Sequence, residues 1–429
     1  MPAIIVIGAQ WGDEGKGKIV DHLAERTSMV VRFQGGNNAG HTVVIGDTVL
    51  KLHQVPAGIT RPQVAAVLGN GMVINPLALV EELDKLEETG IDTRNLHISA
   101  NAHVIMPYHI ILDDLEEKMR GPYALGTTKR GIGPAYTDKV ARRGIRIQEL
   151  ISPSLFASSL ERQLGWVNLE LVKIFGHKRL LAADIIAQYQ PAARRLAPFV
   201  TETSLLINNA LVRGEHVMLE GAQATMLDID FGTYPYVTSS SPSAGGACQG
   251  AGISPLAIKE ILGIVKVYTS RVGKGPFPTE LTDATGDWII EHGNEYGTTT
   301  GRRRRCGWID LVGLRYAQRI NGFSGIALTR LDILTGMDEI KLCVAYRLPD
   351  GSVVQELPMQ TALLEHAEPV YETMPGWHEP ISAARSLEEL PVSARSYCQR
   401  VAELLQVPIY MISVGAERND LVALHWPIP

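Results

Sequence analysis

A glycine-rich segment near the N-terminus has the spacing of a phosphate-binding loop. Residues 12–18 read Gly-Asp-Glu-Gly-Lys-Gly-Lys, after an apolar run and before a predicted helix. Glycines let backbone N–H groups close around phosphate oxygens, and the helix N-terminus adds a partial positive charge. The usual Ser or Thr after the lysine is replaced by Ile19, so Asp13 is the obvious oxygen donor for Mg²⁺. The alternative is an ordinary glycine-rich turn with solvated lysines.

A second glycine-rich segment, residues 34–42, carries an imidazole and two amides. Asn37 and Asn38 precede His41 and offer donors and acceptors to a polar ligand. A lone histidine is more often structural than catalytic. If Asp13 and His41 meet at one phosphate site, the carboxylate and the imidazole form a base–acid pair.

The sequence Thr-Arg-Leu-Asp at residues 329–332 is similar to the guanine-reading element of GTPases, where a basic residue precedes the aspartate by two. A carboxylate accepts hydrogen bonds from N1–H and the exocyclic amine of guanine. Adenine has an unprotonated N1 and no 2-amino group. Asp332 would therefore select GTP over ATP.

A dense cationic segment, residues 298–305, reads Thr-Thr-Thr-Gly-Arg-Arg-Arg-Arg in a chain of formal net charge −6. The acidic balance and the absence of interleaved aromatic residues argue against nucleic-acid binding. Threonine hydroxyls and guanidinium groups suit carboxylates and phosphates, which favours an anionic co-substrate. A solvated run of charges is the alternative.

The elements that must position these residues alternate between short β-branched runs and longer helical stretches. This alternation predicts βαβ units and a mostly parallel sheet. Six of the predicted strands lead directly into polar or glycine-rich clusters, and ligands bind beyond the carboxyl ends of parallel strands, so the clusters describe one extended site. The strands are expected over residues 4–7, 29–33, 65–68, 216–219, 264–268, 325–328 and 409–412.

Two helical stretches are marked by their polar residues. A helix is predicted over residues 76–89, with Asn75 as N-cap, Pro76 at its first position and Gly90 after its end. Further along, an acidic group is expected to form a solvated helix face rather than a metal site; it consists of Asp113, Asp114, Glu116 and Glu117.

Composition sets the class of protein. The 429 residues are 45% hydrophobic and 20% charged, as in a packed globular protein, either of about three domains or of one large α/β domain with insertions. No apolar run is long enough to span a membrane, and the N-terminus has no signal-peptide features. The four cysteines have no CxxC spacing, which disfavours zinc and disulfides and indicates a reducing cytosol. The residues themselves thus indicate Mg²⁺- and nucleotide-dependent phosphoryl transfer with an anionic second substrate.

Several long segments together closely resemble the adenylosuccinate synthetases, which join aspartate to IMP at the expense of GTP; they are residues 11–18, 126–136, 232–240, 297–305 and 413–415. The resemblance spans almost the whole chain. It implies one large α/β domain over residues 1–429, with a mostly parallel sheet, helices on both faces, a phosphate-loop-like GTP site and smaller inserted elements. It also implies a homodimer, and the cysteine pattern leads us to expect a cytoplasmic location. No nucleic-acid or membrane partner is expected.

The resemblance assigns the chemistry to Asp13 and His41. Asp13 would remove the N1 proton of IMP and bind Mg²⁺ together with the carbonyl of Gly40. His41 would act as the acid that assists transfer of the γ-phosphate of GTP to O6 of IMP. The amine of aspartate would then displace phosphate from 6-phosphoryl-IMP.

The resemblance also implies three sets of substrate contacts. GTP would be bound by Gly12, Asp13, Glu14, Gly15, Lys16, Gly17, Lys18, Gly40, His41, Thr42, Arg304, Arg330, Leu331, Asp332, Ser413, Val414 and Gly415. IMP would be bound by Asp13, Glu14, Gly15, Lys16, Asn38, Ala39, Gly40, His41, Thr128, Gln223, Thr238 and Arg302, and by Arg142 of the neighbouring subunit. Aspartate would be bound by Thr298, Thr299, Thr300, Gly301, Arg302, Arg303 and Arg304.

Some positions depart from the family pattern. Arg330 stands where many members have lysine, and Val414 and Ala416 replace a threonine and a proline, which could loosen the guanine pocket. Two other functions remain as alternatives, a phosphate-loop kinase and a GTP-dependent switch protein. Neither requires a second anionic pocket, so the arginine run argues against both.

Overall fold

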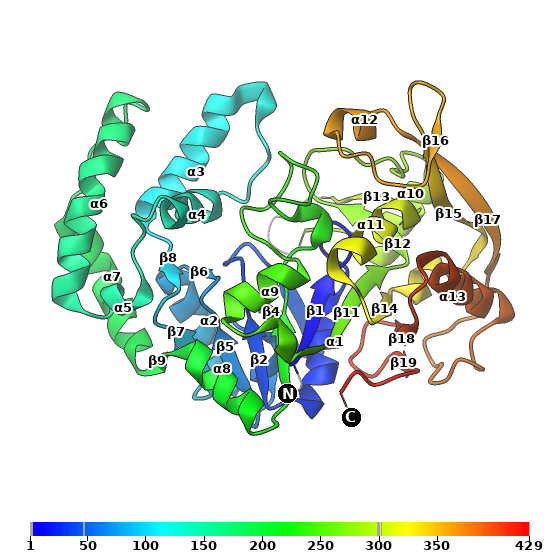
Figure 1. Ribbon diagram of the computed structural model, residues 1–429, viewed down its shortest axis with the longest axis horizontal. Helices are drawn as coiled ribbons and strands as arrows, with labels where there is room; N and C mark the ends of the chain where they lie inside the picture. The colour runs from blue at the N-terminus through cyan, green and yellow to red at the C-terminus, as the bar shows by residue number, and fades with distance from the viewer. Residues whose placement is uncertain (1–2, 46–47, 298–300, 302, 429) are drawn as a thin grey trace.

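A ten-stranded sheet, mostly parallel, forms the centre of the molecule (Figure 1). The computed structural model describes residues 3–45, 48–297, 301 and 303–428. Across the sheet the order is β19-β18-β14-β11-β1-β10-β2-β5-β7-β9. These strands are, in that order, Leu421–Ala423, Ile409–Ser413, Gly325–Thr329, Ile258–Lys266, Ala3–Gly8, Val217–Glu220, Met29–Arg32, Ala65–Leu68, Leu96–Ser99 and Val200–Thr201. Only β19 pairs antiparallel to its neighbour among them, so the predicted mostly parallel sheet is confirmed.

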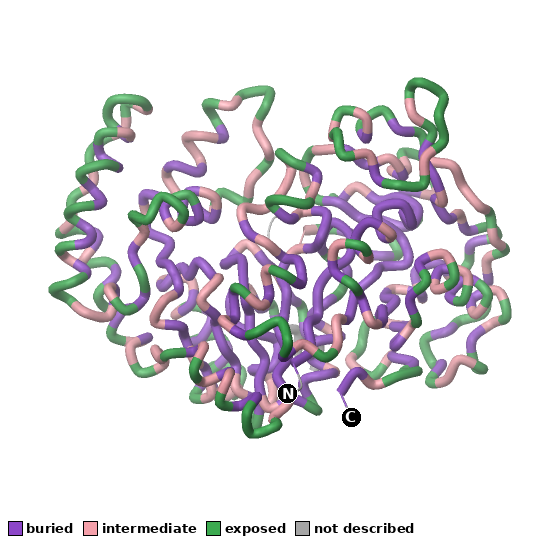
Figure 2. Tube along the Cα trace, viewed as in Figure 1, coloured by how far each residue is buried: buried purple, intermediate pink, exposed green. Residues whose placement is uncertain are grey.

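Both faces of this sheet are covered, because successive side chains of each strand point to opposite sides. In β1, Ile4 and Val6 belong to one core cluster, and Ile5 and Ile7 to the other. The first cluster takes in side chains of α1 (Lys16–Leu23), α2 (Pro76–Glu88), α6 (Pro153–Lys173) and α7 (Ala182–Leu196). The second takes in α8 (Thr203–Val212), α9 (Ala244–Ala251), α11 (Leu311–Asn321) and α13 (Val392–Leu405). The buried residues concentrate between these layers (Figure 2).

A smaller sheet lies beside the central one and corrects one predicted strand. The expected strand over residues 264–268 ends at Lys266, and Tyr268–Arg271 forms a separate strand, β12. Strand β12 pairs antiparallel with β13 (Arg305–Asp310) in a sheet that also contains β15 (Met337–Arg347), β16 (Val353–Val354) and β17 (Glu368–Trp377). The apolar run passes from one sheet to the other without a glycine or proline, so the sequence carries no signal of the break.

Shorter elements complete the chain. Two small two-stranded sheets pair β3 (His41–Ile45) with β4 (Thr48–Leu52) and β6 (Val73–Ile74) with β8 (His103–Val104). The remaining helices are α3 (Pro107–Arg120), α4 (Ile132–Val140), α5 (Ile147–Leu150), α10 (Ala284–Gly293) and α12 (Thr361–Glu365). Within the described residues, no helix combines the length and the apolar character needed to cross a membrane.

The predicted helix over residues 76–89 is confirmed as α2. The side chain of Asn75 accepts a hydrogen bond from the amide of Ala78 at 3.2 Å, and Pro76 is the first helical residue. The helix ends at Glu88, one residue before the predicted end, and Gly90 follows with φ of 83°.

Close backbone contacts fix the end of β2, where the segment carrying His41 begins. The amide of Gly71 donates to the carbonyl of Gly250 at 3.0 Å, and both glycines lie against the backbone of Phe33. A Cβ atom on Gly250 would lie 2.0 Å from the Phe33 carbonyl oxygen. The start of residues 34–42 therefore depends on glycine at position 250.

We predict that Gly250→Ala destabilises the protein by about 1–3 kcal/mol, because backbone atoms must move to accept the new methyl group. Gly245→Ala is the matched control, since position 245 lies in the same helix and a Cβ there meets no atom within 4 Å. The control variant should be unchanged or up to about 1 kcal/mol more stable. Urea unfolding measures both; equal stability of the two variants would contradict the packing argument.

Candidate active site

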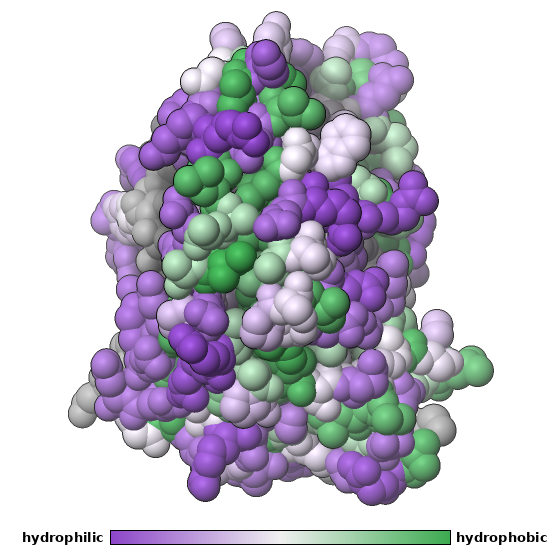
Figure 3. Space-filling model, turned by 90° about the vertical axis from the view of Figure 1, so that its left-hand side faces the viewer, coloured by the Kyte–Doolittle hydropathy of each residue, from purple (hydrophilic) through white to green (hydrophobic). Residues whose placement is uncertain are grey.

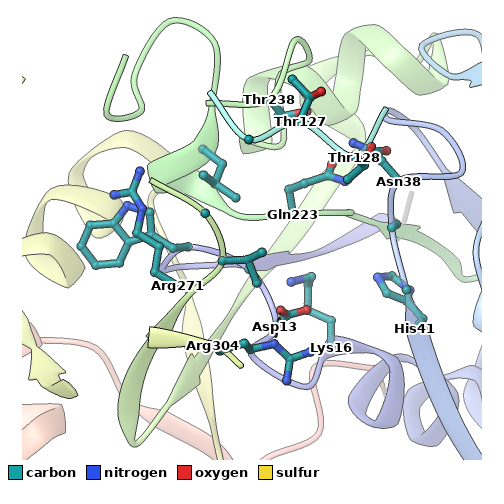
Figure 4. A pocket seen from close by; sticks show the side chains of 18 of the residues that line it. Asp13, Lys16, Asn38, His41, Thr127, Thr128, Gln223, Thr238, Arg271 and Arg304 are labelled. Carbon is teal, nitrogen blue, oxygen red and sulfur yellow. Dashed lines mark ion pairs between the residues drawn. The ribbon is translucent and has the colours of Figure 1, made fainter. Parts of the chain in front are cut away.

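A cleft of about 810 Å³ lies where the parallel strands end. Five strand ends contribute to its lining: Asp13 follows β1, Asn38 follows β2, Gln223 follows β10, Asp332 follows β14, and Ser413 ends β18. Five of the six clusters predicted to share one edge of the sheet therefore line a single cavity. The sixth, residues 269–273, also contributes to the lining, but it comes from β12 of the smaller sheet and the turn after it. Figure 4 shows many of its lining side chains as sticks, with the principal ones labelled.

The segment 12–18 folds as a tight loop and then enters α1, as predicted. Gly12, Asp13 and Gly15 have φ of 90°, 59° and 84°, so the chain turns through the left-handed region before the helix begins. Gly15 is the N-cap of α1 and has no side chain to cap the first N–H groups. The helix N-terminus faces the cleft, as an anion site requires.

The carboxylate of Glu14 holds this loop from inside. Its Oε1 accepts from the amides of Gln10 at 3.1 Å and Gly12 at 2.8 Å, and its Oε2 lies 2.5 Å from Nζ of Lys16. Glu14 is fully buried and is not among the residues that line the cleft. The side chain of Glu14 therefore organises the loop, and only its backbone is left to make the contacts expected with GTP and IMP.

Asp13 and Arg304 lie side by side in the cleft (Figure 4). Oδ2 of Asp13 is 2.7 Å from Nε of Arg304, and the Asp13 side chain is 34% exposed. The other end of the guanidinium, Nη1, donates to Oε2 of the buried Glu295 at 3.0 Å. Arg304 therefore connects an accessible carboxylate to a buried one.

His41 is buried and forms a very short contact through Nδ1 with Oε1 of Glu220. The other oxygen of Glu220 accepts from the amide of Ala57 at 2.9 Å. Burial lowers the pKa of His41, although the Glu220 carboxylate opposes that shift. Burial also raises the pKa of Glu220, but His41 and Arg32 outweigh it and hold that pKa below its ordinary value. Glu220 is thus an ionised acceptor that fixes the proton of His41 on Nδ1 and directs Nε2 away from itself.

The opposite side of the cleft is lined by hydroxyl and amide groups (Figure 4). Gln223 has φ of 55°, and its Oε1 accepts from Nε2 of Gln34 at 3.0 Å. Oδ1 of Asn38 accepts from the amide of Gly36 at 3.2 Å. With Thr128 and Thr238, these side chains offer neutral donors and acceptors to a polar ligand.

The acidic residues of α3 correct another expectation. Asp113 and Glu117 are buried instead of forming part of a solvated face. Glu117 accepts from the amides of residues 125, 126 and 127 at 3.1, 2.8 and 3.3 Å. Asp113 accepts from Oγ1 of Thr127 at 2.8 Å and from the amide of Gly131 at 2.9 Å. The two carboxylates hold the loop that carries Thr128, a long-range role that helical periodicity does not show.

The expected guanine end contains a carboxyl oxygen without a partner. Oδ1 of Asp332 is buried and has no hydrogen-bond partner among the described residues, and burial raises the pKa of this group. Nearby, Nζ of Lys18 donates to Oγ of Ser413 and to the carbonyls of Gly415 and Asp420 at 2.8–2.9 Å. Burial lowers the pKa of Lys18 to about 8. An unpaired carboxyl oxygen in a cleft is a ready acceptor for a ligand N–H.

The remaining expected contacts divide into three groups. Leu331 and Val414 are fully buried in the core, so only their backbones can reach a ligand. Arg303 pairs with Asp287 and, like Gly301 and the exposed Arg142, is not among the residues that line the cleft. Thr298, Thr299, Thr300 and Arg302 lie outside the described residues.

Several buried charged residues at or beside the cleft received no role of their own from the sequence; among them are Glu220, Lys266 and Arg271. Glu220 is the last residue of β10, and Lys266 is the last residue of β11 and stands in an otherwise apolar run. Arg271, on β12, donates to the carbonyl of Pro276 at 2.6 Å and stacks 5.3 Å from the ring of Trp11. A charged residue inside or directly after a buried strand was the available signal.

Comparison with known proteins gives a consistent result. The family model described as adenylosuccinate synthetase matches residues 5–422. The chain is 53% identical to the adenylosuccinate synthetase of Carboxydothermus hydrogenoformans over 424 residues, covering 99% of each. It is 52% identical to that of Moorella thermoacetica over the full length of both. The structure of a fully ligated adenylosuccinate synthetase from Plasmodium falciparum superposes with a TM-score of 0.93 at 39% identity, covering 98% of this chain and 99% of that one.

We predict that Glu14→Ala destabilises the fold by about 3–5 kcal/mol, because it leaves the buried ammonium of Lys16 unpaired. The double variant Glu14→Ala/Lys16→Ala removes both charges and should be more stable than the Glu14→Ala variant. Urea unfolding of the parent, both single variants and the double variant gives the coupling energy. Additive effects would mean that the two side chains do not stabilise each other.

Proposed function

This chain belongs to the adenylosuccinate synthetase family, and from that premise we propose how its residues carry out the family reaction. The protein is a GTP-dependent ligase that joins IMP and L-aspartate to form adenylosuccinate, GDP and phosphate, in the synthesis of AMP. The supporting observation is the convergence of Asp13, His41, Gln223 and Asp332 on one cleft from separate strand ends. The cleft combines a phosphate loop, an accessible carboxylate and a site for a purine base.

Asp13 is the general base of the first step. IMP loses its N1 proton to the Asp13 carboxylate, and the resulting oxyanion at O6 attacks the γ-phosphorus of GTP. The bond from that phosphorus to the β–γ bridging oxygen breaks, and GDP leaves. The accessibility of the Asp13 carboxylate in the cleft supports this role, and Gln223 and Asn38 are placed to contact the base of IMP.

His41 assists this phosphoryl transfer. Its Nε2 is free of Glu220 and faces a cleft built for phosphate. A phosphoryl group beside the ring would add negative charge to that of Glu220 and so favour the imidazolium, which opposes the effect of burial on the His41 pKa. The imidazolium then donates to the transferring group and stabilises its developing charge.

The second step uses 6-phosphoryl-IMP as an activated intermediate. The amine of aspartate attacks C6, the C6–O6 bond breaks with departure of phosphate, and the amine loses its proton. Phosphorylation is needed because an oxo group is otherwise a poor leaving group. On the family resemblance, the carboxylates of aspartate are assigned to the arginine run and the threonines before it: Thr298, Thr299, Thr300, Gly301, Arg302, Arg303 and Arg304.

GTP is assigned to the phosphate loop and to the strand ends beyond it. Its phosphates would contact Gly12, the residues 15–18, Thr42 and Arg304, and its guanine would contact Asp332, Ser413 and Gly415. The unpartnered Oδ1 of Asp332 supports this assignment, because guanine supplies the two N–H donors that a carboxylate can accept. Arg330 adds a positive charge beside that carboxylate.

The cleft suits a Mg²⁺ ion bound to the phosphates of GTP. Asp13 offers an accessible carboxylate and Gly40 a backbone carbonyl, and the described residues contain no cluster of three or more acidic, His or Cys ligands. Mg²⁺ commonly takes one or two carboxylates together with substrate phosphates, so this donor set fits. Bound there, the ion would neutralise charge on the phosphates during transfer.

Arg142 is proposed to reach the cleft of the neighbouring subunit in a homodimer. It follows α4, is exposed, and has φ of 61°, so the chain turns sharply as it leaves the helix. Val140, two residues earlier, is 79% exposed. An exposed arginine beside an exposed apolar side chain is typical of an interface.

Helix α6 gives further support for self-association. It exposes Leu155, Trp166, Leu169 and Val172 on its outer side. Figure 3 shows this face, where hydrophobic side chains lie among hydrophilic ones. Large apolar side chains in one region of a surface indicate a protein contact.

A cytoplasmic location is proposed because the cysteines are not paired in disulfides. Cys248, Cys306, Cys343 and Cys398 are all free thiols, and the last three are buried. Unpaired cysteines suit a reducing compartment.

The activity is tested by following adenylosuccinate in the ultraviolet with IMP, aspartate, GTP and Mg²⁺, leaving out one component at a time. Product should require all four. GTP consumption that continues without IMP or without aspartate would instead indicate a switch GTPase or a kinase.

We predict that Asp13→Asn lowers kcat by about 10²–10⁴-fold while the unfolding midpoint is unchanged, because the amide cannot accept the N1 proton. Positional isotope exchange of ¹⁸O-labelled GTP, measured with IMP but without aspartate, reports formation of 6-phosphoryl-IMP. The parent should show the exchange and Asp13→Asn should lose it. Exchange at the parental rate in Asp13→Asn would exclude Asp13 as the base.

The role of Arg142 predicts recovery of activity in mixed dimers. Arg142→Leu and Asp13→Asn should each be nearly inactive alone. In a heterodimer one cleft combines the intact Asp13 of one subunit with the intact Arg142 of the other, so mixing should restore up to about one quarter of parental activity for statistical exchange. If mass spectrometry verifies exchange and no activity returns, each site is self-contained.

A further inference from the structure

A network of buried charges lies behind Arg304, on the side away from the cleft. Glu295 is 0% exposed and Lys266 is 1% exposed. Oε1 of Glu295 accepts from Nζ of Lys266 at 2.9 Å and from the hydroxyl of Tyr268 at 2.5 Å. Oε2 accepts from Nη1 of Arg304 at 3.0 Å. Both carboxylate oxygens are thus occupied by donors.

The backbone reinforces the same contact. The amide of Arg304 donates to the carbonyl of Glu295 at 2.9 Å, and the amide of Glu295 donates to the carbonyl of Ile290 at 2.9 Å. Asn294, with φ of 47°, turns the chain at the end of α10 so that Glu295 points inward. Arg304 is therefore tied to Glu295 through both its main chain and its side chain.

Stability alone does not account for this network. Removing a lysine and a glutamate from water costs several kcal/mol for each ion, and apolar residues of similar volume are often as stable. The pair is better explained by what it does to Arg304. Lys266 neutralises Glu295, and Glu295 in turn holds one end of a guanidinium whose Nε lies 2.7 Å from Asp13.

We propose that Glu295 is a positioning residue of the ligase: its buried carboxylate, neutralised by Lys266, holds the guanidinium of Arg304 in place beside Asp13. Arg304 can then meet the phosphates of GTP with part of its conformational entropy already lost. Without the charge of Glu295, Arg304 and Lys266 would be two cations around a neutral group, and the guanidinium would no longer be fixed. The inference rests on the proposed contact between Arg304 and GTP.

The test is a double-mutant cycle of Glu295→Gln and Arg304→Met. The amide of Glu295→Gln keeps the shape of the side chain but removes its charge. In the parent background, KM for GTP should rise roughly tenfold, as for loss of a charged hydrogen bond, while KM for IMP changes less than twofold. In the Arg304→Met background, Glu295→Gln should change KM for GTP less than twofold, because its effect passes through Arg304. Calorimetric Kd values for GTP replace KM where turnover is too slow.

Glu280→Gln is the matched control. Glu280 pairs with the next arginine of the run, Arg305, through Nε at 2.8 Å, and neither residue lines the cleft. This variant should keep KM for GTP within twofold of the parental value. If Glu295→Gln does not fold, Glu295→Asp keeps the charge on a shorter side chain and should raise KM for GTP without changing KM for IMP.

Five results would overturn the inference. An unchanged KM for GTP in Glu295→Gln, or an equal rise in both KM values, would remove the specific link to GTP. A tenfold effect that persists with Arg304→Met would mean that Glu295 does not act through Arg304. A tenfold effect of Glu280→Gln would indicate general loosening of this region. A parental KM for GTP in Arg304→Met would instead disprove the proposed GTP contact, and with it the inference.

Discussion

Parallel pairing of the central strands is the constraint on which the site depends. Strands β1, β2, β10, β11, β14 and β18 all run in the same direction, so residues far apart in the chain leave the sheet at one edge. The phosphate loop, the imidazole segment and the aspartate at position 332 meet there for that reason. A sheet with alternating strand directions would have divided these groups between two edges.

Buried carboxylates then fix the residues that reach the cleft. Glu14 binds the backbone of the phosphate loop, Glu220 orients His41, and Glu295 holds Arg304. Each carboxylate is paired with a cation, an imidazole or backbone N–H groups, so none is an isolated charge in the core. Their common effect is a rigid set of groups behind a polar, open cleft, as preorganised catalysis requires.

The loops at the rim have a different support. The segment that carries Thr128 is held by the α3 carboxylates Asp113 and Glu117, through donors from residues 125–131. This side of the cleft therefore rests on a peripheral helix instead of on the sheet. The arrangement gives the rim loops fewer core contacts than the strand ends, which suits segments that must admit and release substrates.

The sequence by itself determined the parallel sheet, helix α2 and the main segments that meet at the cleft, because strand runs, capping residues and the glycine-rich motifs are local patterns. Tertiary structure decided which carboxylates are structural. Glu14 lies inside a motif yet turns into the loop, Asp113 and Glu117 face a loop rather than water, and Glu295 was not singled out at all. The break after Lys266 was equally hidden, since the run stays apolar where it changes sheets. In each case the deciding contact joins residues that are distant in the sequence, or depends on a turn of the backbone that directs the side chain inward. Such contacts exist only after the chain has folded.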